Sequence, residues 1–287
     1  MQATLQAPCA HDKHEKHGNT CLWQRNNCDA EFAKRGLGML KISVVTAVFN
    51  RNRTIAEALN STAAQSYINV EHIIQDGGST DGTLAILEER VGDSLVLDSA
   101  PDSGIYDGIN KGIQRATGDV IGLMHSDDLF ADQRVLSWVA EAFRDPDIDG
   151  VYGDLDYVAA DDTSTIIRRW RSGTYAPEKL RRGWMPPHPT LYLRREVYET
   201  WGLYDVSYQI AADYDAMLRF LVKGSIRLAY VPKVFVKMRV GGESNKSLSK
   251  IFRKSREDYR AICTNGIGGV GTLAAKNFSK IPQFFIG

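Results

Sequence analysis

From Leu40 onward, strand-type and helix-type segments alternate, and this alternation restricts the fold more than any other feature of the sequence. Residues 41–50 (KISVVTAVFN) form a nearly continuous apolar run rich in β-branched residues, which is typical of a strand covered on both faces. The next segment, 53–66, predicts a helix with one apolar stripe, made of Ile55, Ala58, Leu59 and Ala63. Repetition of this pair predicts βαβ crossovers and a mostly parallel sheet.

The same patterns continue to about residue 250, with no linker, repeat or low-complexity segment between. Further strands are expected within 70–83, 94–100, 119–125, 150–158, 165–173 and 227–244. Helices are expected within 83–91, 104–118, 135–145 and 211–224, and the segment 185–205 is predicted to be irregular and then helical. We therefore predict an α/β protein with one compact domain.

Polar residues follow three of the predicted strands at the point where each strand ends. They are Asn50, Asp76 and Asp128. In parallel sheets, ligands bind at the carboxyl ends of the strands, so these residues are expected to meet at one rim.

Two adjacent carboxylates, Asp127 and Asp128, directly follow the apolar strand 120–125. They repel each other unless a cation lies beside them, and Mg²⁺ and Mn²⁺ prefer such oxygen ligands. The alternative is a solvated turn, in which Asp128 or Asp132 caps the following helix.

Five segments, found in family order between about Leu40 and Ser247, resemble the family 2 inverting glycosyltransferases of the GT-A fold. The nearest members are those of bacterial exopolysaccharide, colanic-acid and O-antigen biosynthesis. The segments are VVTAVFNR (44–51), QDGGSTDGT (75–83), the stretch 99–128, PHPTLYLRREVYETWGLYD (187–205) and AADYDAMLR (211–219). The resemblance implies a single Rossmann-like domain whose mostly parallel central sheet is flanked by helices.

The resemblance also implies roles for individual residues. The nucleotide pocket would contain Thr46, Ala47, Phe49 and Asn50, with Asp76 on the base and Asp102 and Lys111 along the donor. Asp127 and Asp128 match the acidic motif, with Asp128 as the direct ligand of Mg²⁺ or Mn²⁺. Asp213 matches the catalytic base, although Ala212 stands where the family has a glutamate. His188 falls near the acceptor side, where a buried structural histidine is the alternative.

The reaction implied is a metal-dependent transfer by a hexosyltransferase. Asp213 would take a proton from an acceptor hydroxyl, and one attack on the anomeric carbon would invert it. The donor would be a UDP- or GDP-sugar and the acceptor a glycan or a lipid-linked oligosaccharide. Asp215 lies two positions after Asp213 and faces another side of the helix, so we expect it to face solvent or to cap.

The two ends of the chain differ from the body. Residues 1–38 lack apolar periodicity and are predicted to be a disordered extension, with a zinc site of His11, His14, His17, Cys9 and Cys21 as the alternative. We expect the glycosyltransferase domain to cover 39–250 and a helical, amphipathic tail to cover 251–287. Basic and apolar residues in that tail are expected either to rest on an anionic membrane or to pack on the body or a partner chain: Lys276, Lys280, Phe278, Ile281, Phe284, Phe285 and Ile286.

Composition narrows the possible partners and compartment. Lys+Arg and Asp+Glu are both 35, and this balance argues against nucleic-acid binding. Four cysteines without a framework favour a reducing compartment. No segment has the length of a membrane span, so we expect a cytoplasmic protein, with peripheral contact to the inner face of the plasma membrane as an option.

Other activities fit the sequence less well. A nucleotidyltransferase needs a glycine-rich basic loop after its first strand, and residues 47–54 contain no glycine. A nicotinamide oxidoreductase needs its glycine motif in the same place, whereas GIGGVG lies at 266–271. A non-catalytic nucleotide-sugar-binding protein is favoured only by Ala212.

Overall fold

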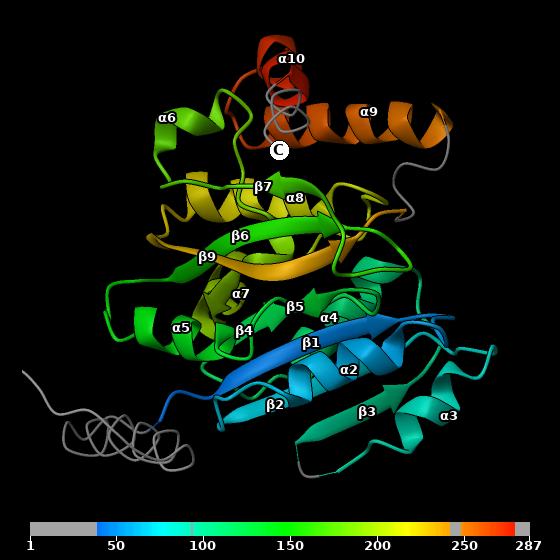
Figure 1. Cartoon of the computed structure of the whole chain (residues 1–287). Helices are drawn as coiled ribbons and strands as arrows, with labels where there is room; N and C mark the ends of the chain where they lie inside the picture. The colour runs from blue at the N-terminus through cyan, green and yellow to red at the C-terminus, as the bar shows by residue number, and fades with distance from the viewer. Residues whose placement is uncertain (1–38, 93, 242–247, 279–287) are drawn as a thin grey trace, which may run out of the picture. The chain divides into compact units, whose positions relative to one another are not determined.

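The computed structural model describes residues 39–92, 94–241 and 248–278, and nearly all of these lie in the second of two compact units, residues 40–287. The predicted disorder and the zinc alternative concern residues 1–38, outside the described residues. Within the described part, one nine-stranded sheet has the order β3-β2-β1-β4-β8-β6-β9-β5, with β7 paired to β6 (Figure 1). The strands are β1 (Ile42–Val48), β2 (Val70–Asp76), β3 (Leu95–Ser99), β4 (Val120–Leu123), β5 (Leu129–Phe130), β6 (Gly150–Val158), β7 (Ile166–Trp170), β8 (Tyr192–Arg194) and β9 (Leu228–Arg239).

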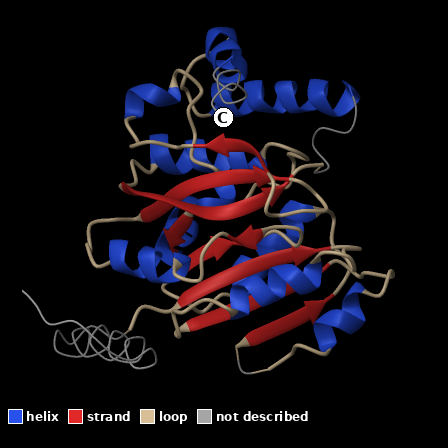
Figure 2. Ribbon diagram, in the orientation of Figure 1, coloured by secondary structure: helices blue, strands red, loops and turns tan. Residues whose placement is uncertain are grey.

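Helices flank this sheet (Figure 2). They are α2 (Ile55–Ala63), α3 (Thr83–Glu88), α4 (Ile105–Arg115), α5 (Val135–Ala142), α6 (Pro177–Leu180), α7 (Arg195–Trp201), α8 (Ala212–Leu218), α9 (Leu248–Thr264) and α10 (Val270–Phe278). A 3₁₀ turn, η1 (His188–Thr190), precedes β8, and a π-helical turn, η2 (Arg219–Lys223), continues α8.

The sheet is mostly parallel, as the alternation of segments predicts. Strands β3, β2, β1 and β4 are mutually parallel, and β6 is parallel to β9. Strand β8 runs antiparallel between β4 and β6. The α/β architecture with helices around a mostly parallel sheet is therefore confirmed.

The apolar run in β1 reflects burial on both faces. Val45 packs with Ile109 and Ile113 of α4, whereas Val44 belongs to a second cluster that includes Val139 of α5. Gly112 lets α4 approach β1 closely, because a Cβ there would collide with the side chain of Val45. Close packing of α4 fixes the start of that helix at the rim of the sheet, where the site is formed.

Two elements differ from the prediction. Strand β8 was not expected within 185–205, because three residues are too few to show a period and the strand is defined by pairing with β4 and β6. The helix expected over 211–224 is split, since it is α-helical only to Leu218 and then π-helical.

The C-terminal helices pack through a buried ion cluster. Lys276 and Asp258 are each 1% exposed, and Lys276 Nζ lies 2.7 Å from Asp258 Oδ1. Lys254 Nζ contacts the other carboxylate oxygen at 2.7 Å, and the Lys276 ammonium lies over the ring of Tyr214.

Of the two expectations for Lys276, packing on the body is confirmed, because its charge is neutralised inside the protein and does not rest on a membrane. Phe278 is 68% exposed, whereas Lys280, Ile281, Phe284, Phe285 and Ile286 lie outside the described residues. No helix in the described part of the chain is long and apolar enough to span a membrane.

Removing the Asp258 charge is expected to destabilise the fold strongly. Asp258→Asn leaves Lys276 buried without its counter-ion, which typically costs about 3–5 kcal/mol of unfolding free energy. Burial acts to raise the pKa of Asp258, but Lys276 and Lys254 outweigh it and the pKa is lowered. The contribution is therefore present at neutral pH and is lost as the pH falls toward and below the ordinary carboxyl value.

Denaturant titration at pH 7 and at about pH 2, below the ordinary carboxyl pKa, measures this contribution. Lys254→Met is the matched control, because Lys254 is 29% exposed and its ion pair is expected to contribute about 1 kcal/mol or less. Equal losses in the two variants would contradict the proposed importance of the buried pair.

Candidate active site

The carboxyl ends of β1 and β2 are joined by Asn50. In the parallel register Val48 pairs with Asp76, so the loops that follow both strands begin side by side. Asn50 Oδ1 accepts the Thr80 N–H at 2.9 Å, and the Asn50 N–H donates to Ser79 Oγ at 2.9 Å. Asn50 has a φ of 52°, in the left-handed region that asparagine tolerates better than most residues. Its local role is to hold the two loops together at the rim.

Asp76 organises the loop after β2. It is fully buried, and its Oδ2 accepts hydrogen bonds from Gly78 N, Ser79 N and Ser99 Oγ at 3.1, 3.0 and 2.7 Å. Its Oδ1 accepts one from Ser79 Oγ. The structure thus accounts for the carboxylate as a loop anchor, and its contact with a base stays a prediction.

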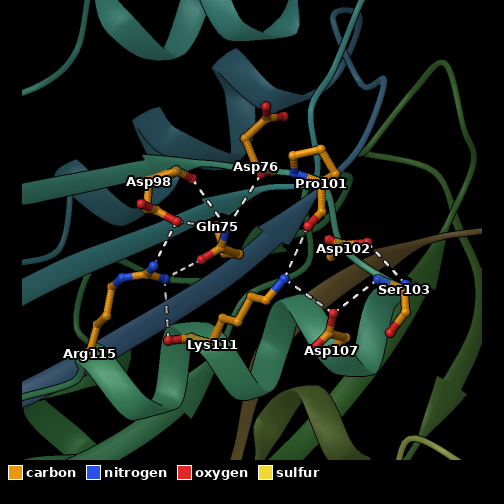
Figure 3. Close-up of polar contacts among 10 residues, drawn as sticks. Gln75, Asp76, Asp98, Pro101, Asp102, Ser103, Asp107, Lys111 and Arg115 are labelled. Carbon is orange, nitrogen blue, oxygen red and sulfur yellow. Dashed lines mark hydrogen bonds and ion pairs between the residues drawn. The ribbon is translucent and has the colours of Figure 1, made fainter.

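Asp102 lies on the loop before α4, next to the loop that follows β2, and Lys111 lies on α4 itself (Figure 3). Asp102 accepts the Gly104 N–H at 3.0 Å, and its carboxylate occupies the space that side chains at Gly77 and Gly108 would need. Lys111 Nζ bonds the Pro101 carbonyl at 3.1 Å and lies 3.2 Å from Asp107 Oδ2. The two predicted donor residues therefore belong to one polar cluster beside the rim.

The remaining residues of the predicted nucleotide pocket differ in exposure. Phe49 is 54% exposed at the end of β1, and Ala47 is partly buried against α4 near Gly108. Thr46 is 1% exposed, and its hydroxyl lies 2.9 Å from His72 Nε2. The Thr46 side chain therefore faces the interior of the sheet and not the rim.

Arg239, at the end of β9, holds the acidic motif. Its backbone N–H donates to Asp128 Oδ1 at 3.1 Å, and its guanidinium donates to the Asp127 carbonyl at 2.6 Å and to Glu57 at 2.6 Å. Arg239 is 8% exposed, so this link between β4, α2 and β9 is largely dry. No local sequence pattern indicates this link, because Asp128, Asp127 and Glu57 lie more than 100 residues before Arg239.

The two adjacent aspartates have different surroundings. Asp128 is 1% exposed and its Oδ2 has no hydrogen-bond partner, whereas Asp127 is partly exposed. Burial, followed by the charge of Asp127, raises the pKa of Asp128 well above its usual range. Asp127 lines a cavity of about 860 Å³, together with residues 50–54, Glu57, 160–163 and 239–241.

This arrangement fits a divalent cation. A buried carboxylate oxygen without a partner is satisfied by a positive charge, and Asp127 gives access from the open side. Among the described residues, no three His, Cys, Asp or Glu side chains form a cluster able to hold a metal. Mg²⁺ and Mn²⁺ at phosphate sites often use only one or two carboxylates, with substrate phosphates and water as the other ligands.

A chain of hydrogen bonds connects Asp213 with His125, which lies two residues before Asp127. His188 Nδ1 lies 3.2 Å from Asp213 Oδ2, and His188 Nε2 lies 2.8 Å from His125 Nε2. Tyr106, in the first turn of α4, shares its hydroxyl hydrogen between the Ile210 carbonyl at 2.7 Å and Asp213 Oδ1 at 3.2 Å. The structure therefore brings the predicted base and His188 together.

Burial and nearby charges determine the protonation of His125 and His188. Burial, and then His188, lowers the pKa of His125 to about 4, and burial lowers the pKa of His188. The charges of Asp127 and Asp213 oppose this lowering of the His125 pKa. At neutral pH both rings are uncharged. Because a carboxylate only accepts, His188 carries its hydrogen on Nδ1, and its Nε2 accepts from His125.

The spacing to Asp213 led us to expect that Asp215 faces solvent or caps the helix. The structure shows neither. Asp215 is 6% exposed and accepts a hydrogen bond from Asn265 Nδ2 at 2.9 Å. Asp215 is buried because α9 and its C-terminal turn cover this side of α8. No sequence pattern near Asp215 indicates this contact. Sequence reasoning also missed His125 and Tyr106, although both lie in quoted motifs.

Comparison with known proteins relates this site to a family. The family model of glycosyl transferase family 2 matches residues 43–202. A PGL/p-HBAD biosynthesis glycosyltransferase of Mycobacterium bovis is 29% identical over 221 residues, which cover 74% of this chain and 82% of that protein. An uncharacterized glycosyltransferase of Mycobacterium tuberculosis is 31% identical over 62% of this chain and 68% of its own length.

Solved structures share the fold. S. aureus TarS 1–349 in complex with UDP-GlcNAc has a TM-score of 0.61 at 18% identity, over 79% of this chain and 66% of that one. The mannosyltransferase PcManGT from Pyrobaculum calidifontis, in complex with GDP-Man and Mn²⁺, has a TM-score of 0.60 at 15% identity, over 93% and 84%. The chain spans 40% of a longer TarS chain. The predicted GT-A fold is confirmed, and the chain is a glycosyltransferase that belongs to glycosyl transferase family 2.

Proposed function

We propose that this enzyme transfers a sugar from a nucleotide-diphosphate sugar to a hydroxyl of a glycan or lipid-linked acceptor, with inversion, in bacterial surface polysaccharide synthesis. The observation that carries this proposal is the Asp213–His188–His125 chain, which ends beside the acidic motif. It connects a carboxylate able to act as a base with the place where a metal-bound diphosphate would lie. Asp213 would thus act on the acceptor hydroxyl, and Asp127 on the side of the departing diphosphate.

Asp213 is proposed as the base that accepts the hydroxyl proton. His188 donates to Oδ2 and so fixes the orientation of the carboxylate. Among the described residues, Oδ1 shares only the Tyr106 hydrogen, whose shorter contact is to the Ile210 carbonyl. Oδ1 is therefore the oxygen best able to take a proton. His188 acts on the acceptor side as the residue that orients this base.

The donor is proposed to lie over the ends of β1, β2 and β4. The exposed ring of Phe49 offers a face for a base, with Asp76, Asn50 and the Asp102–Lys111 cluster along the nucleotide. Ala47 is proposed to shape the wall beneath the nucleotide, and Thr46 to support that wall from the interior of the sheet. TarS is described with UDP and UDP-GlcNAc and PcManGT with GDP-Man, which supports a UDP- or GDP-sugar.

Asp128, with Asp127, is proposed to hold Mg²⁺ or Mn²⁺. The ion would neutralise the charge that develops on the departing diphosphate. PcManGT, described with Mn²⁺, supports this assignment.

The acceptor is proposed from the name of one relative and from the sequence resemblance. The mycobacterial relative is named for PGL/p-HBAD biosynthesis, and the polysaccharide pathway rests on the sequence resemblance. We propose a cytoplasmic enzyme that acts on a glycan or lipid-linked oligosaccharide.

A nucleotide-release assay tests the proposed function. UDP- and GDP-sugars are screened with Mg²⁺ or Mn²⁺ and with lipid-linked acceptors, and both diphosphate nucleotide and pyrophosphate are measured. Release of UDP or GDP coupled to glycosylated product supports the proposal. Pyrophosphate release would indicate a nucleotidyltransferase, and donor binding without any product would indicate a non-catalytic nucleotide-sugar-binding protein.

We propose that α9, and not Lys276, makes peripheral contact with an anionic membrane. Its exposed face carries Phe252 at 75% and Tyr259 at 40% exposure, with exposed Arg253 and Arg256 beside them. Aromatic and basic residues together suit the surface of an anionic bilayer. This surface would keep the enzyme near a lipid-linked acceptor.

Sedimentation with vesicles tests the α9 surface. Wild type is expected to bind vesicles that contain anionic phospholipid more tightly than zwitterionic ones. Arg256→Ser is expected to weaken this binding roughly fivefold, because one surface arginine contributes about 1 kcal/mol. Val270→Ser, at an exposed apolar position of α10, is the control. Equal binding by Phe252→Ser, Arg256→Ser and wild type would contradict the proposal.

A further inference from the structure

The inward edge of α9 binds the loop that precedes α8. Glu257 Oε2 accepts hydrogen bonds from three consecutive backbone amides, at Gln209, Ile210 and Ala211, with distances of 3.2, 2.8 and 3.0 Å. Glu257 Oε1 also accepts the Gln209 N–H at 3.1 Å. Successive N–H groups that converge on one anion form a concave binding site of the kind seen in anion nests. Here the anion is a side chain from a distant part of the chain.

These three amides lead directly to Asp213. Ala211 is the N-cap of α8, and no local side chain caps that helix end. A serine, threonine or aspartate usually provides such a cap. Glu257 instead supplies a negative charge just before the start of the helix, where backbone N–H groups favour one.

The same peptide is also held from its other side. In the peptide unit between Ile210 and Ala211, the carbonyl accepts the Tyr106 hydroxyl hydrogen and the N–H donates to Glu257. The peptide is thus fixed between α4 and α9, three residues before Asp213. Tyr106 also contacts Asp213 Oδ1, so a shift of this peptide would move the base relative to its partners.

We infer that Glu257 is a positioning residue for the catalytic base, and that α9 completes the active site from outside the segment matched by the family model. The inference rests on the proposed role of Asp213. Ala212 provides no carboxylate beside Asp213. Glu257, on α9, provides a carboxylate that binds the loop just before Asp213. Glu257 acts through the backbone and does not contact the reacting atoms.

Kinetic analysis of three variants tests this role. Glu257→Gln keeps the shape of the side chain but replaces one acceptor oxygen with an N–H₂ group that faces backbone donors. We expect kcat to fall about 100-fold, the typical effect of a 1 Å displacement of a catalytic group. The KM and the dissociation constant for the nucleotide sugar are expected to stay within about twofold, because the donor residues lie on β1, β2 and β4. Glu257→Asp keeps the charge and is expected to recover part of kcat.

Arg260→Gln is the matched control on the same helix. Arg260 holds the loop at Ser207 and Asp205, upstream of the three amides. Donor-binding titration counts folded sites in every variant, so kcat is expressed per folded enzyme. If Glu257→Gln does not fold, Glu257→Asp provides the comparison, and its kcat is expected to lie below that of Arg260→Gln.

The outcomes separate this inference from the proposed function. A large loss of kcat in the Glu257 variants with unchanged donor affinity, beside an inactive Asp213→Asn, supports the inference. An inactive Asp213→Asn together with Glu257 variants whose kcat equals that of Arg260→Gln would overturn it, even if their melting temperatures fall. Wild-type turnover in Asp213→Asn would instead overturn the proposed function.

Discussion

Asp213→Asn is expected to lower kcat by about 10³-fold while leaving donor affinity nearly unchanged. General-base catalysis typically contributes 10²–10⁴-fold, and asparagine cannot take the hydroxyl proton. The substitution preserves size, and its carbonyl oxygen still accepts the His188 Nδ1 hydrogen. Steady-state product formation with acceptor gives kcat, and calorimetry with a nucleotide sugar gives the affinity.

Asp205→Asn is the control for this prediction. Asp205 lies on the loop before α8, its side chain is 43% exposed, and it pairs with Arg260 at the surface. Its substitution is expected to change kcat less than twofold, since exposed ion pairs contribute little. Retention of more than a tenth of wild-type kcat by Asp213→Asn would show that another group removes the proton.

Removal of divalent metal is expected to abolish transfer, and Asp128→Asn to lower metal-supported turnover by about 10²-fold or more. A Lewis acid at the departing diphosphate supplies several kcal/mol of stabilisation. Asp128 Oδ2 is buried without a partner, so a cation there satisfies an otherwise costly group. Titration of Mn²⁺ into chelated enzyme gives the concentration for half-maximal turnover, which is expected to rise in Asp128→Asn and Asp127→Asn.

Asp161→Asn separates a metal ligand from a nearby charge. Asp161 lines the same cavity as Asp127 but is exposed on the loop between β6 and β7. Its substitution is expected to leave the metal requirement unchanged. Full turnover in chelator, or the same metal dependence in Asp128→Asn as in wild type, would contradict a catalytic cation at this motif.

The features predicted correctly from the sequence were those encoded by local patterns. The run 42–48 is apolar at almost every position because β1 is buried on both faces, so the parallel sheet was predictable. Asn50, Asp76 and Asp128 follow strands, and the topology alone brings them to one rim. Asp213 lies in a recognisable segment, and its role as the catalytic base stays a prediction.

The features that were missed depend on contacts between distant residues. The sequence left both a membrane contact and packing on the body open for Lys276, because its partner Asp258 lies 18 positions earlier on a helix that folds back against it. Glu257 and Arg239 act on backbone amides and carbonyls, which any sequence presents equally. Strand β8 likewise could not be predicted from the sequence, because its three residues form a strand by pairing with β4 and β6.

The anomeric configuration of the product tests the central claim most directly. A single base and one direct attack must invert the anomeric carbon, so the glycoside formed from an α-linked nucleotide sugar is expected to be β. Proton NMR during turnover, with the acceptor identified by nucleotide release, distinguishes the two anomers as they form. A β product that disappears with Asp213→Asn is the predicted result. A product that retains the α configuration would require a different arrangement of catalytic groups and would contradict the role assigned to Asp213.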